Sequence, residues 1–205
     1  MYGYFAIIRG PMEEIWIKKK KFTVVKVVAN HPDHDSYIAT YANVSYLVRV
    51  YREEYQKVLD DYKLLKHCGI NMAKMNFHDD ERQIIAFDAF HENDVLSELS
   101  KGPLPEEYFR ALFALYRFAR FSKIALDWAP QNFMLRGSQM FYLPIKVSKM
   151  DETNGLEKVG LASWFHGKEL KEILKKKGYD VSGYQMMSDA EVNKSMALMA
   201  IKYWN

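Results

Sequence analysis

The sequence predicts an α+β fold, with a small antiparallel sheet and one helix first and a mainly helical part afterwards. Two observations support this prediction. β-Branched and aromatic residues are dense over residues 22–50, as in paired strands. From residue 93 onward, apolar residues recur at helical spacing instead. Strands, one helix, further strands and then several helices are the order expected of an α+β protein.

The first part of the chain contains five strand-like runs, and the longest is interrupted by a turn at Ala42-Asn43. The runs cover 15–17, 22–29, 37–50, 72–77 and 83–90. Between the third and fourth runs, the period changes to that of a helix over residues 51–68. Gly69 follows as a natural C-terminal stop for this helix.

The second part is predicted to be helical around one hairpin. Asn93 or Asp94 can cap a short helix, and Glu106-Glu107 open a longer one after a Gly- and Pro-rich break. The remaining expected elements are hairpin strands at 132–135 and 140–143 and helices near 154–165, 166–177 and 189–203. Ser188 and Glu191 form a capping box before the last helix.

Composition narrows the protein class. The 205 residues carry a net charge of +3 and are 49% hydrophobic, which suits a globular core and is too weakly basic to indicate nucleic-acid binding. The single cysteine, Cys68, excludes an intramolecular disulfide and fits a reducing compartment. No run is long enough to span a membrane, and the apolar start lacks the basic region of a signal peptide. We therefore expect a cytoplasmic location.

The most informative stretch is residues 124–135, which contains an acid, a proline and an amide at fixed spacing. Asp127 is followed by Pro130 three residues later and by Asn132 five residues later. In a protein-kinase catalytic loop, an acid holds the acceptor hydroxyl and an asparagine five residues on holds a metal ion. A proline between them stiffens the turn that aims both groups.

With this motif, the chain resembles the protein-kinase-like fold over roughly residues 22–143, in the reduced form of small bacterial and atypical kinase-like proteins. Segments similar to its parts follow in order: nucleotide-covering strands at 22–29 and 37–41, a V-A-I-K-like strand at 46–50, an αC-like helix at 53–66, a strand towards the hinge at 84–90 and the next helix at 95–99. The resemblance implies two lobes. These are an N-lobe over 1–90 with the antiparallel sheet and αC-like helix, and a reduced, mainly helical C-lobe over 91–205 with the catalytic-loop-like hairpin.

The resemblance also implies roles for particular residues. Asp127 would be the catalytic acid and Asn132 the metal ligand. Three residues would bind the nucleotide cofactor: Arg49 in place of the strand lysine, Asp61 as its helix partner, and Lys26 as an alternative cation. Glu54 is a second candidate for the partner of Arg49. A solvent-exposed ion pair and an outward-pointing lysine are the structural alternatives.

Three departures from the kinase pattern concern phosphate handling. Residues 30–36 contain no glycine where a Gly-rich loop should allow backbone N–H groups to approach a polyphosphate, and Asp33 and Asp35 would repel it. Arginine does not simply substitute for lysine at position 49. Counting along the hairpin places the metal-binding Asp of D-F-G near Pro144, which has no carboxylate. The histidine and arginine of H-R-D are replaced by Ala125 and Leu126, and no A-P-E follows.

Three functions remain open. The first is a pseudokinase that acts by binding a protein partner, with weak or no phosphotransfer. The second is an active atypical phosphotransferase that uses ATP, Mg²⁺, Asp127 and Asn132. The third is an unrelated α+β protein-interaction module. Either ATP with Mg²⁺ or no cofactor is therefore expected, and nucleic acid is not an expected partner.

Structural roles compete with the catalytic ones in this loop. Asp127 could cap a turn, and Asn132 could bridge the loop to the next strand. Trp128 is expected to anchor the loop by packing. If it also covers Asp127 from water, it would raise the pKa of that carboxyl. His31 and His34 flank Pro32-Asp33 in what we expect to be a hairpin turn rather than a metal site.

Overall fold

The computed structural model describes residues 13–204 and has the expected α+β architecture. The chain forms two compact units. Among the described residues, one contains 13–57 together with 73–90, and the other contains 58–72 together with 91–204. Each unit has a hydrophobic core of its own.

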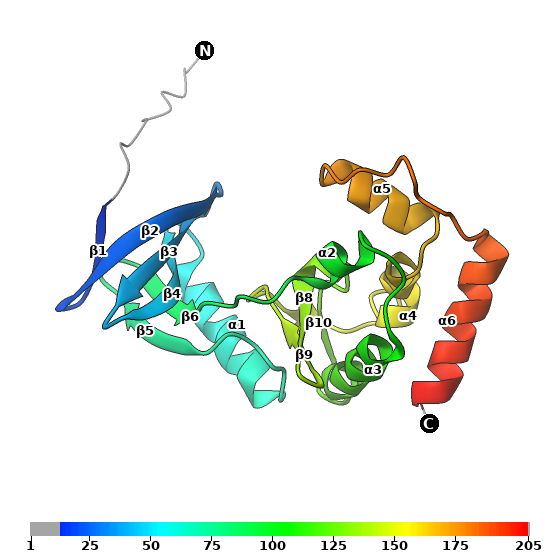
Figure 1. The fold of residues 1–205 in the computed structure, drawn as a ribbon. Helices are drawn as coiled ribbons and strands as arrows, with labels where there is room; N and C mark the ends of the chain where they lie inside the picture. Colours follow the sequence, from blue (N-terminus) through cyan, green and yellow to red (C-terminus); the bar gives the residue numbers. More distant parts are fainter. Residues whose placement is uncertain (1–12, 205) are drawn as a thin grey trace, which may run out of the picture. The chain divides into compact units, whose positions relative to one another are not determined.

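The first unit is a curled antiparallel sheet of six strands in the order β1-β2-β3-β4-β6-β5 (Figure 1). Its strands are β1 Glu14–Ile17, β2 Lys20–Asn30, β3 His34–Tyr41, β4 Val44–Tyr51, β5 Met75–Asp79 and β6 Ile84–Asp88. Ala42 and Asn43 both have positive φ angles, 51° and 63°, and form the tight turn between β3 and β4. Such a turn matches the twist of a hairpin, and the expected interruption is confirmed.

An aromatic cluster fills the core of the first unit. Phe22 is fully buried, and its ring lies 5.0 Å from that of Tyr41, 5.6 Å from that of Tyr46 and 5.6 Å from that of Phe77. These four residues come from four different strands, and edge-to-face contacts dominate. The cluster therefore joins β2, β3, β4 and β5 through side chains as well as through the strand ladder.

Helix α1, Tyr55–His67, starts four residues later than the sequence predicts. Tyr51 still belongs to β4, and its N–H donates to the carbonyl of Gln83 at 2.8 Å. The N–H groups of Arg52 and Glu53 both donate to the carbonyl of Asp33. Because the N–H groups of residues 51–53 donate to carbonyls outside a helix, the helix begins only after these residues. Gly69, with a φ of 74°, follows the helix as expected.

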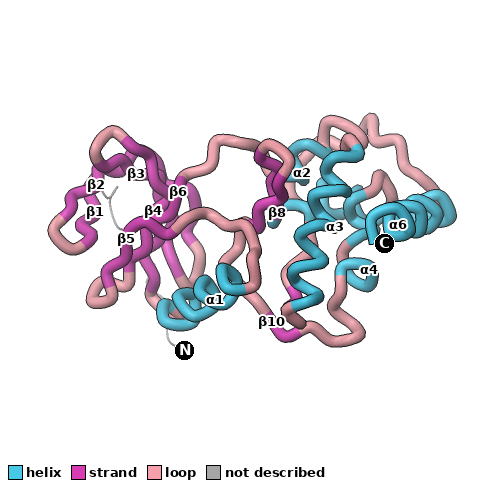
Figure 2. Tube along the Cα trace, turned by 90° about the horizontal axis from the view of Figure 1, so that it is seen from below, coloured by secondary structure: helices cyan, strands magenta, loops and turns pink. Residues whose placement is uncertain are grey.

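The second unit packs its helices around a large core. Its elements after α1 are α2 Val95–Leu99, α3 Glu106–Phe121, β7 Ile124–Ala125, η1 Pro130–Asn132, β8 Phe133–Arg136, β9 Gln139–Tyr142, β10 Ser148–Lys149, α4 Leu156–Val159, η2 Leu161–Trp164, α5 Lys168–Lys176 and α6 Asp189–Trp204. Asp94 caps α2 by accepting the N–H of Ser97 at 2.7 Å. Strands β8 and β9 form the predicted hairpin, and α6 lies beside α3 (Figures 1 and 2).

This unit differs from the sequence prediction in two places. The helix expected over 154–165 is divided into α4 and η2 at Gly160, whose φ of −143° is not helical. A Cβ at this glycine would lie 2.2 Å from the Cβ of Trp128, so the close approach of these two segments decides the break. The short antiparallel pair of β7 and β10 was not predicted, because two-residue strands have no period.

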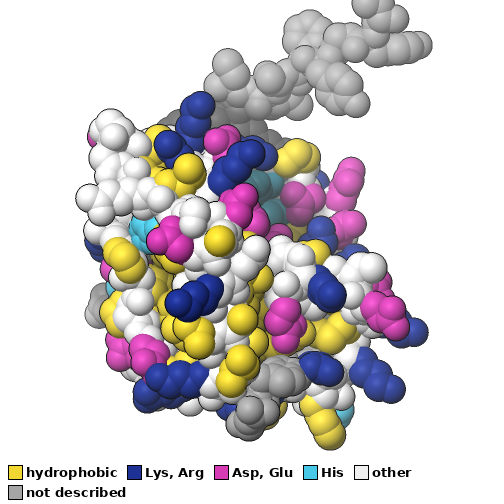
Figure 3. Space-filling view, turned by 90° about the vertical axis from the view of Figure 1, so that its right-hand side faces the viewer, with side chains coloured by type: hydrophobic (Ala, Val, Ile, Leu, Met, Phe, Trp, Pro, Cys, Tyr) yellow, Lys and Arg dark blue, Asp and Glu magenta, His cyan; other side chains and the backbone are white. Residues whose placement is uncertain are grey.

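Helix α6 begins with the predicted capping box. Glu191 accepts bonds from the backbone N–H and the hydroxyl of Ser188, and the Ser188 hydroxyl accepts the N–H of Glu191. Leu198 and Ile201 on this helix are 55% and 67% exposed. On the side of the molecule that carries α6, hydrophobic side chains lie among lysines and acids (Figure 3). Within residues 13–204, no helix has the length and apolar character needed to cross a membrane.

Candidate functional site

The motif found in the sequence forms a compact loop in the second unit. Strand β7 leads into it and is held by pairing with β10, Ala125 opposite Ser148. The turn of η1 closes the loop, with Pro130 at its first position, where a fixed φ suits a helical start. Strand β8 then leaves the loop and enters the hairpin.

The loop brings Asp127 and Asn132 into contact. The Nδ2 of Asn132 donates to the backbone carbonyl of Asp127 at 3.2 Å. The Oδ1 of Asp127 accepts the N–H of Ala129 at 3.2 Å, and the Asp127 side chain is otherwise exposed. Both residues therefore stabilise the loop. The exposed carboxylate and the Oδ1 of Asn132 remain the groups that a kinase-like reaction would use.

Trp128 anchors the loop in the core, as expected. It is 1% exposed, and its ring stacks on Phe133 with the ring centroids 5.8 Å apart. Its indole N–H donates to the carbonyl of Asn154, and its own carbonyl accepts the indole N–H of Trp164 at 2.9 Å. The indole lies in the core of the second unit and does not cover Asp127, whose side chain is exposed.

Tyr142, which the sequence analysis did not single out, holds the backbone of the loop from β9. Its hydroxyl accepts the N–H of Asp127 at 3.2 Å and donates to the carbonyl of Lys146 at 3.0 Å. Burial raises the pKa of Tyr142 to about 12, so the hydroxyl stays protonated and can make both bonds. Only the tertiary structure pairs this tyrosine with the loop, because fifteen residues separate it from Asp127.

The segment where the kinase pattern predicts the D-F-G acid is apolar. Pro144 is half-buried, and Ile145 and Val147 pack against the core of the second unit. The next acid along the chain, Asp151, is engaged in its own turn. Its Oδ1 accepts the N–H and the hydroxyl of Thr153 at 2.7 and 2.6 Å. Across the described residues, no group of three or more His, Cys, Asp or Glu side chains is arranged to hold a metal ion.

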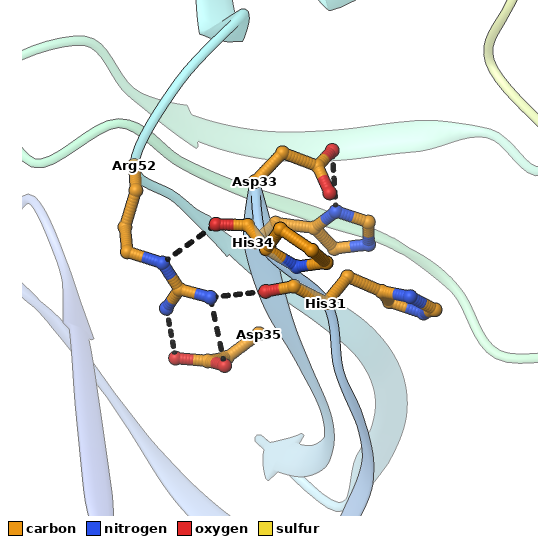
Figure 4. Close-up of polar contacts among 6 residues, drawn as sticks. His31, Asp33, His34, Asp35 and Arg52 are labelled. Atoms are coloured by element: carbon orange, nitrogen blue, oxygen red, sulfur yellow. Dashed lines mark hydrogen bonds and ion pairs between the residues drawn. The ribbon is translucent and has the colours of Figure 1, made fainter. Parts of the chain in front are cut away.

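In the first unit, Arg52 closes the turn between β2 and β3 (Figure 4). Its guanidinium donates to Asp35 through Nη1 at 2.6 Å and through Nη2 at 3.3 Å. The same side chain donates to the carbonyls of His31 and Pro32. Within the turn, the N–H of His31 donates to the carbonyl of His34 at 2.8 Å. Arginine's fixed fork of donors explains how one side chain can bond three residues of the turn.

The histidines of this turn are stacked on each other and on the sheet. The rings of His31 and His34 lie 4.7 Å apart, and those of His34 and Tyr51 lie 5.3 Å apart. Burial lowers the pKa of His34, although its Nδ1 lies 2.9 Å from the Oδ2 of Asp33. The pair belongs to a hairpin turn, as expected from Pro32-Asp33.

The three predicted nucleotide-binding residues lie on different elements. Arg49 on β4 places its guanidinium carbon 5.6 Å from the centroid of the Phe87 ring, and its Nε is buried without a hydrogen-bond partner in the described part of the chain. Lys26 on β2 is exposed, next to an irregularity in the pairing with β3. Asp61 is half-buried on the part of α1 that belongs to the second unit.

Comparison with solved structures indicates a kinase-like fold. The crystal structure of the BubR1 kinase domain is similar to this chain with a TM-score of 0.51 at 10% sequence identity. The match covers 69% of this chain and 51% of the other, so the chain spans about half the length of that structure. No protein-family model matches the sequence, and neither does any curated protein. At this identity, the likeness concerns the fold alone.

Proposed function

We propose that this chain is a degenerate protein-kinase-like domain, a pseudokinase that acts by binding a protein partner and transfers phosphate weakly or not at all. The turn between β2 and β3 carries this proposal. In the fold that the chain resembles, this turn would cover the nucleotide phosphates. Here it presents Asp33 and Asp35, contains no glycine and is closed by Arg52.

The electrostatics of the turn argue against a polyphosphate. A phosphate site of this kind uses free backbone N–H groups on a Gly-rich loop. The N–H of His31 is already bonded to the carbonyl of His34, and the guanidinium of Arg52 is neutralised by Asp35. An incoming phosphate would have to displace Asp35 from Arg52 and approach two carboxylates.

The apolar segment at Pro144 supports the same conclusion. Phosphoryl transfer depends mainly on positioning and on charge neutralisation by Mg²⁺, so the loss of the D-F-G carboxylate removes a principal metal ligand. Packing of Ile145 into the core leaves an aliphatic side chain in the neighbourhood where the acid was expected. Asn132 would then be left without its partner ligand.

A second candidate function is an atypical phosphotransferase. It is favoured by the retained loop, in which the exposed carboxylate of Asp127 lies beside Asn132. Asp127 would orient or deprotonate the acceptor hydroxyl, and Asn132 would bind Mg²⁺ carried by ATP. Arg49 or Lys26 would supply the cation for the phosphates. The likeness to a kinase domain favours both candidates over an unrelated interaction module.

Calorimetric titration with MgATP distinguishes the two candidates. For the pseudokinase we expect no saturable heat up to about 1 mM nucleotide, where even a binding free energy near −4 kcal/mol would be visible. Asn132→Ala and its control, Asn193→Ala on the exposed side of α6, should then behave alike. Two results together would favour the phosphotransferase over the pseudokinase. MgATP binding would need Mg²⁺ and disappear only in Asn132→Ala, and phosphate transfer would be lost in Asp127→Asn.

A further inference from the structure

The outer side of α3 exposes two phenylalanines near its C-terminal end. Phe118 is 55% exposed and Phe121 is 92% exposed, although the opposite side of the same helix lies in the core of the second unit. A single exposed apolar residue is ordinary. Residues three apart on a helix are neighbours on its surface, so these two rings form one patch.

A small groove adjoins this patch. It has a volume of about 170 Å³ and is lined by residues that include Gly69, Ala114, Phe118 and Met140. The Cδ1 of Phe118 lies 3.4 Å from the position that a Cβ on Gly69 would take, so the ring packs beside the backbone that follows α1. Apolar anchors next to a hollow are the arrangement found at the centres of protein interfaces.

The charged side chains that α3 itself places beside the patch are basic, while the acids Asp151, Glu152 and Glu157 line a pocket together with Arg120 and Lys123. Residues 108–123 contain four cations, Arg110, Arg117, Arg120 and Lys123, and no acid. The acids of α3 lie at its start, where Glu106 approaches Arg110 only to 3.9 Å. The exposed Lys66 at the end of α1 adds a further cation close to Gly69.

We propose that this α3 surface, defined by Arg110, Arg117, Phe118 and Phe121, binds an acidic protein segment that carries apolar anchor residues. Phenylalanine and arginine are enriched at protein interfaces, whereas lysine is depleted there. The guanidinium of Arg117 donates to the carbonyl of Tyr203 through Nη1 and keeps other N–H groups for a carboxylate. An acidic partner fits better than a second copy of the chain, because two copies would bring like charges together.

Selection from a phage-displayed library of random linear peptides on the full chain tests this inference. We expect the enriched peptides to combine glutamate or aspartate with aromatic or branched apolar residues. A synthetic peptide from the selection should bind in fluorescence anisotropy and weaken as salt is raised, because exposed charges are screened. Phe121→Ser should weaken it about tenfold, as loss of an interface anchor does. The ring is exposed, so the variant should fold normally, which circular dichroism can verify.

Matched variants on α6 make the test specific. Leu198→Ser removes an apolar side chain that is as exposed as Phe118, and Lys194→Glu reverses an exposed charge, so both should leave peptide binding unchanged. Arg117→Glu should weaken binding at least as much as Phe121→Ser.

Three outcomes would each overturn the inference: no enrichment of peptides, enriched peptides without excess acid, or binding by Phe121→Ser equal to that of the unsubstituted chain. So would a dimer in light scattering that Phe121→Ser dissociates. The inference rests on the proposed function, for which it supplies the partner surface, but its test uses no nucleotide. Phosphate transfer from MgATP would refute the pseudokinase without deciding this surface.

Discussion

The guanidinium of Arg52 and the carboxylate of Asp35 form a two-bonded ion pair across the turn between β2 and β3 (Figure 4). Asp35 is the second residue of β3, and Arg52 follows directly after β4. Because the same arginine also bonds the carbonyl of His31, it joins both ends of the turn. Under the proposed function, this closed turn would stand where a kinase has a flexible phosphate-covering loop.

Replacing the guanidinium of Arg52 by a single amine should make the turn between β2 and β3 open more often. Arg52→Lys keeps the charge but cannot donate to Asp35 through two nitrogens while also bonding two carbonyls. We expect the amide of His31, now bonded to the carbonyl of His34, to exchange its hydrogen faster in nuclear magnetic resonance. Arg110→Lys, which changes an exposed arginine with only a 3.9 Å pair, is the control. Unchanged exchange at His31 would mean that the backbone alone holds the turn.

The hydroxyl of Tyr142 should stabilise the loop that contains Asp127. Tyr142→Phe removes the group that accepts the N–H of Asp127 and donates to Lys146, at a fully buried position. We expect the free energy of unfolding in urea to fall by about 1–2 kcal/mol. Tyr108→Phe on α3 should change it little, because its hydroxyl makes no hydrogen bond within residues 13–204. A similar loss in both variants would contradict a specific role for Tyr142.

Close packing at Gly160 should tolerate no side chain. The Cβ of alanine there would lie 2.2 Å from the Cβ of Trp128 and 3.2 and 3.3 Å from its backbone oxygen and Cα, so no flexible side-chain end can move aside. Gly160→Ala should lower the free energy of unfolding by about 3 kcal/mol, the upper range of overpacking. Gly183→Ala, where an added Cβ meets nothing within 4 Å, should stay within about 0.5 kcal/mol of the unsubstituted chain. Equal stability of the two variants would show that α4 and η2 can shift away from Trp128.

Acid should destabilise the second unit through His166. Burial lowers the pKa of His166 below its ordinary value of 6.5, although its Nε2 lies 3.0 Å from the carbonyl of Leu99. The unfolded chain therefore takes up a proton at a higher pH than the folded one. The stabilisation is complete above pH 6.5 and is lost as the pH falls through the folded pKa.

Urea unfolding of the unsubstituted chain and of His166→Gln at about pH 7.5 and 5.5 checks this sign. The unsubstituted chain should lose more stability on acidification than the variant, which retains a side-chain donor but cannot titrate. His34, whose pKa is also lowered by burial, and the carboxylates are common to both proteins. An identical loss in the two proteins would exclude His166 as the titrating group.

The sequence alone predicted most of the elements because their signals are local. The valine-rich run of β2, the turn at Ala42-Asn43 and the capping box at Ser188 each depend on residues close together in the chain. The spacing of Asp127 and Asn132 likewise predicted a loop in which the two residues meet, since five positions across one proline-stiffened turn leave little freedom.

Tertiary structure decided what no local pattern contains. The late start of α1 follows from bonds to Gln83 and Asp33, which lie far away in sequence, and the break at Gly160 follows from the approach of Trp128. Two further contacts join residues far apart in the sequence. Arg52 closes the glycine-free turn by bonding Asp35, seventeen residues away, and Tyr142 bonds the backbone of the Asp127 loop. Periodicity reports which side of an element is apolar, but only packing determines which partner each polar group finds.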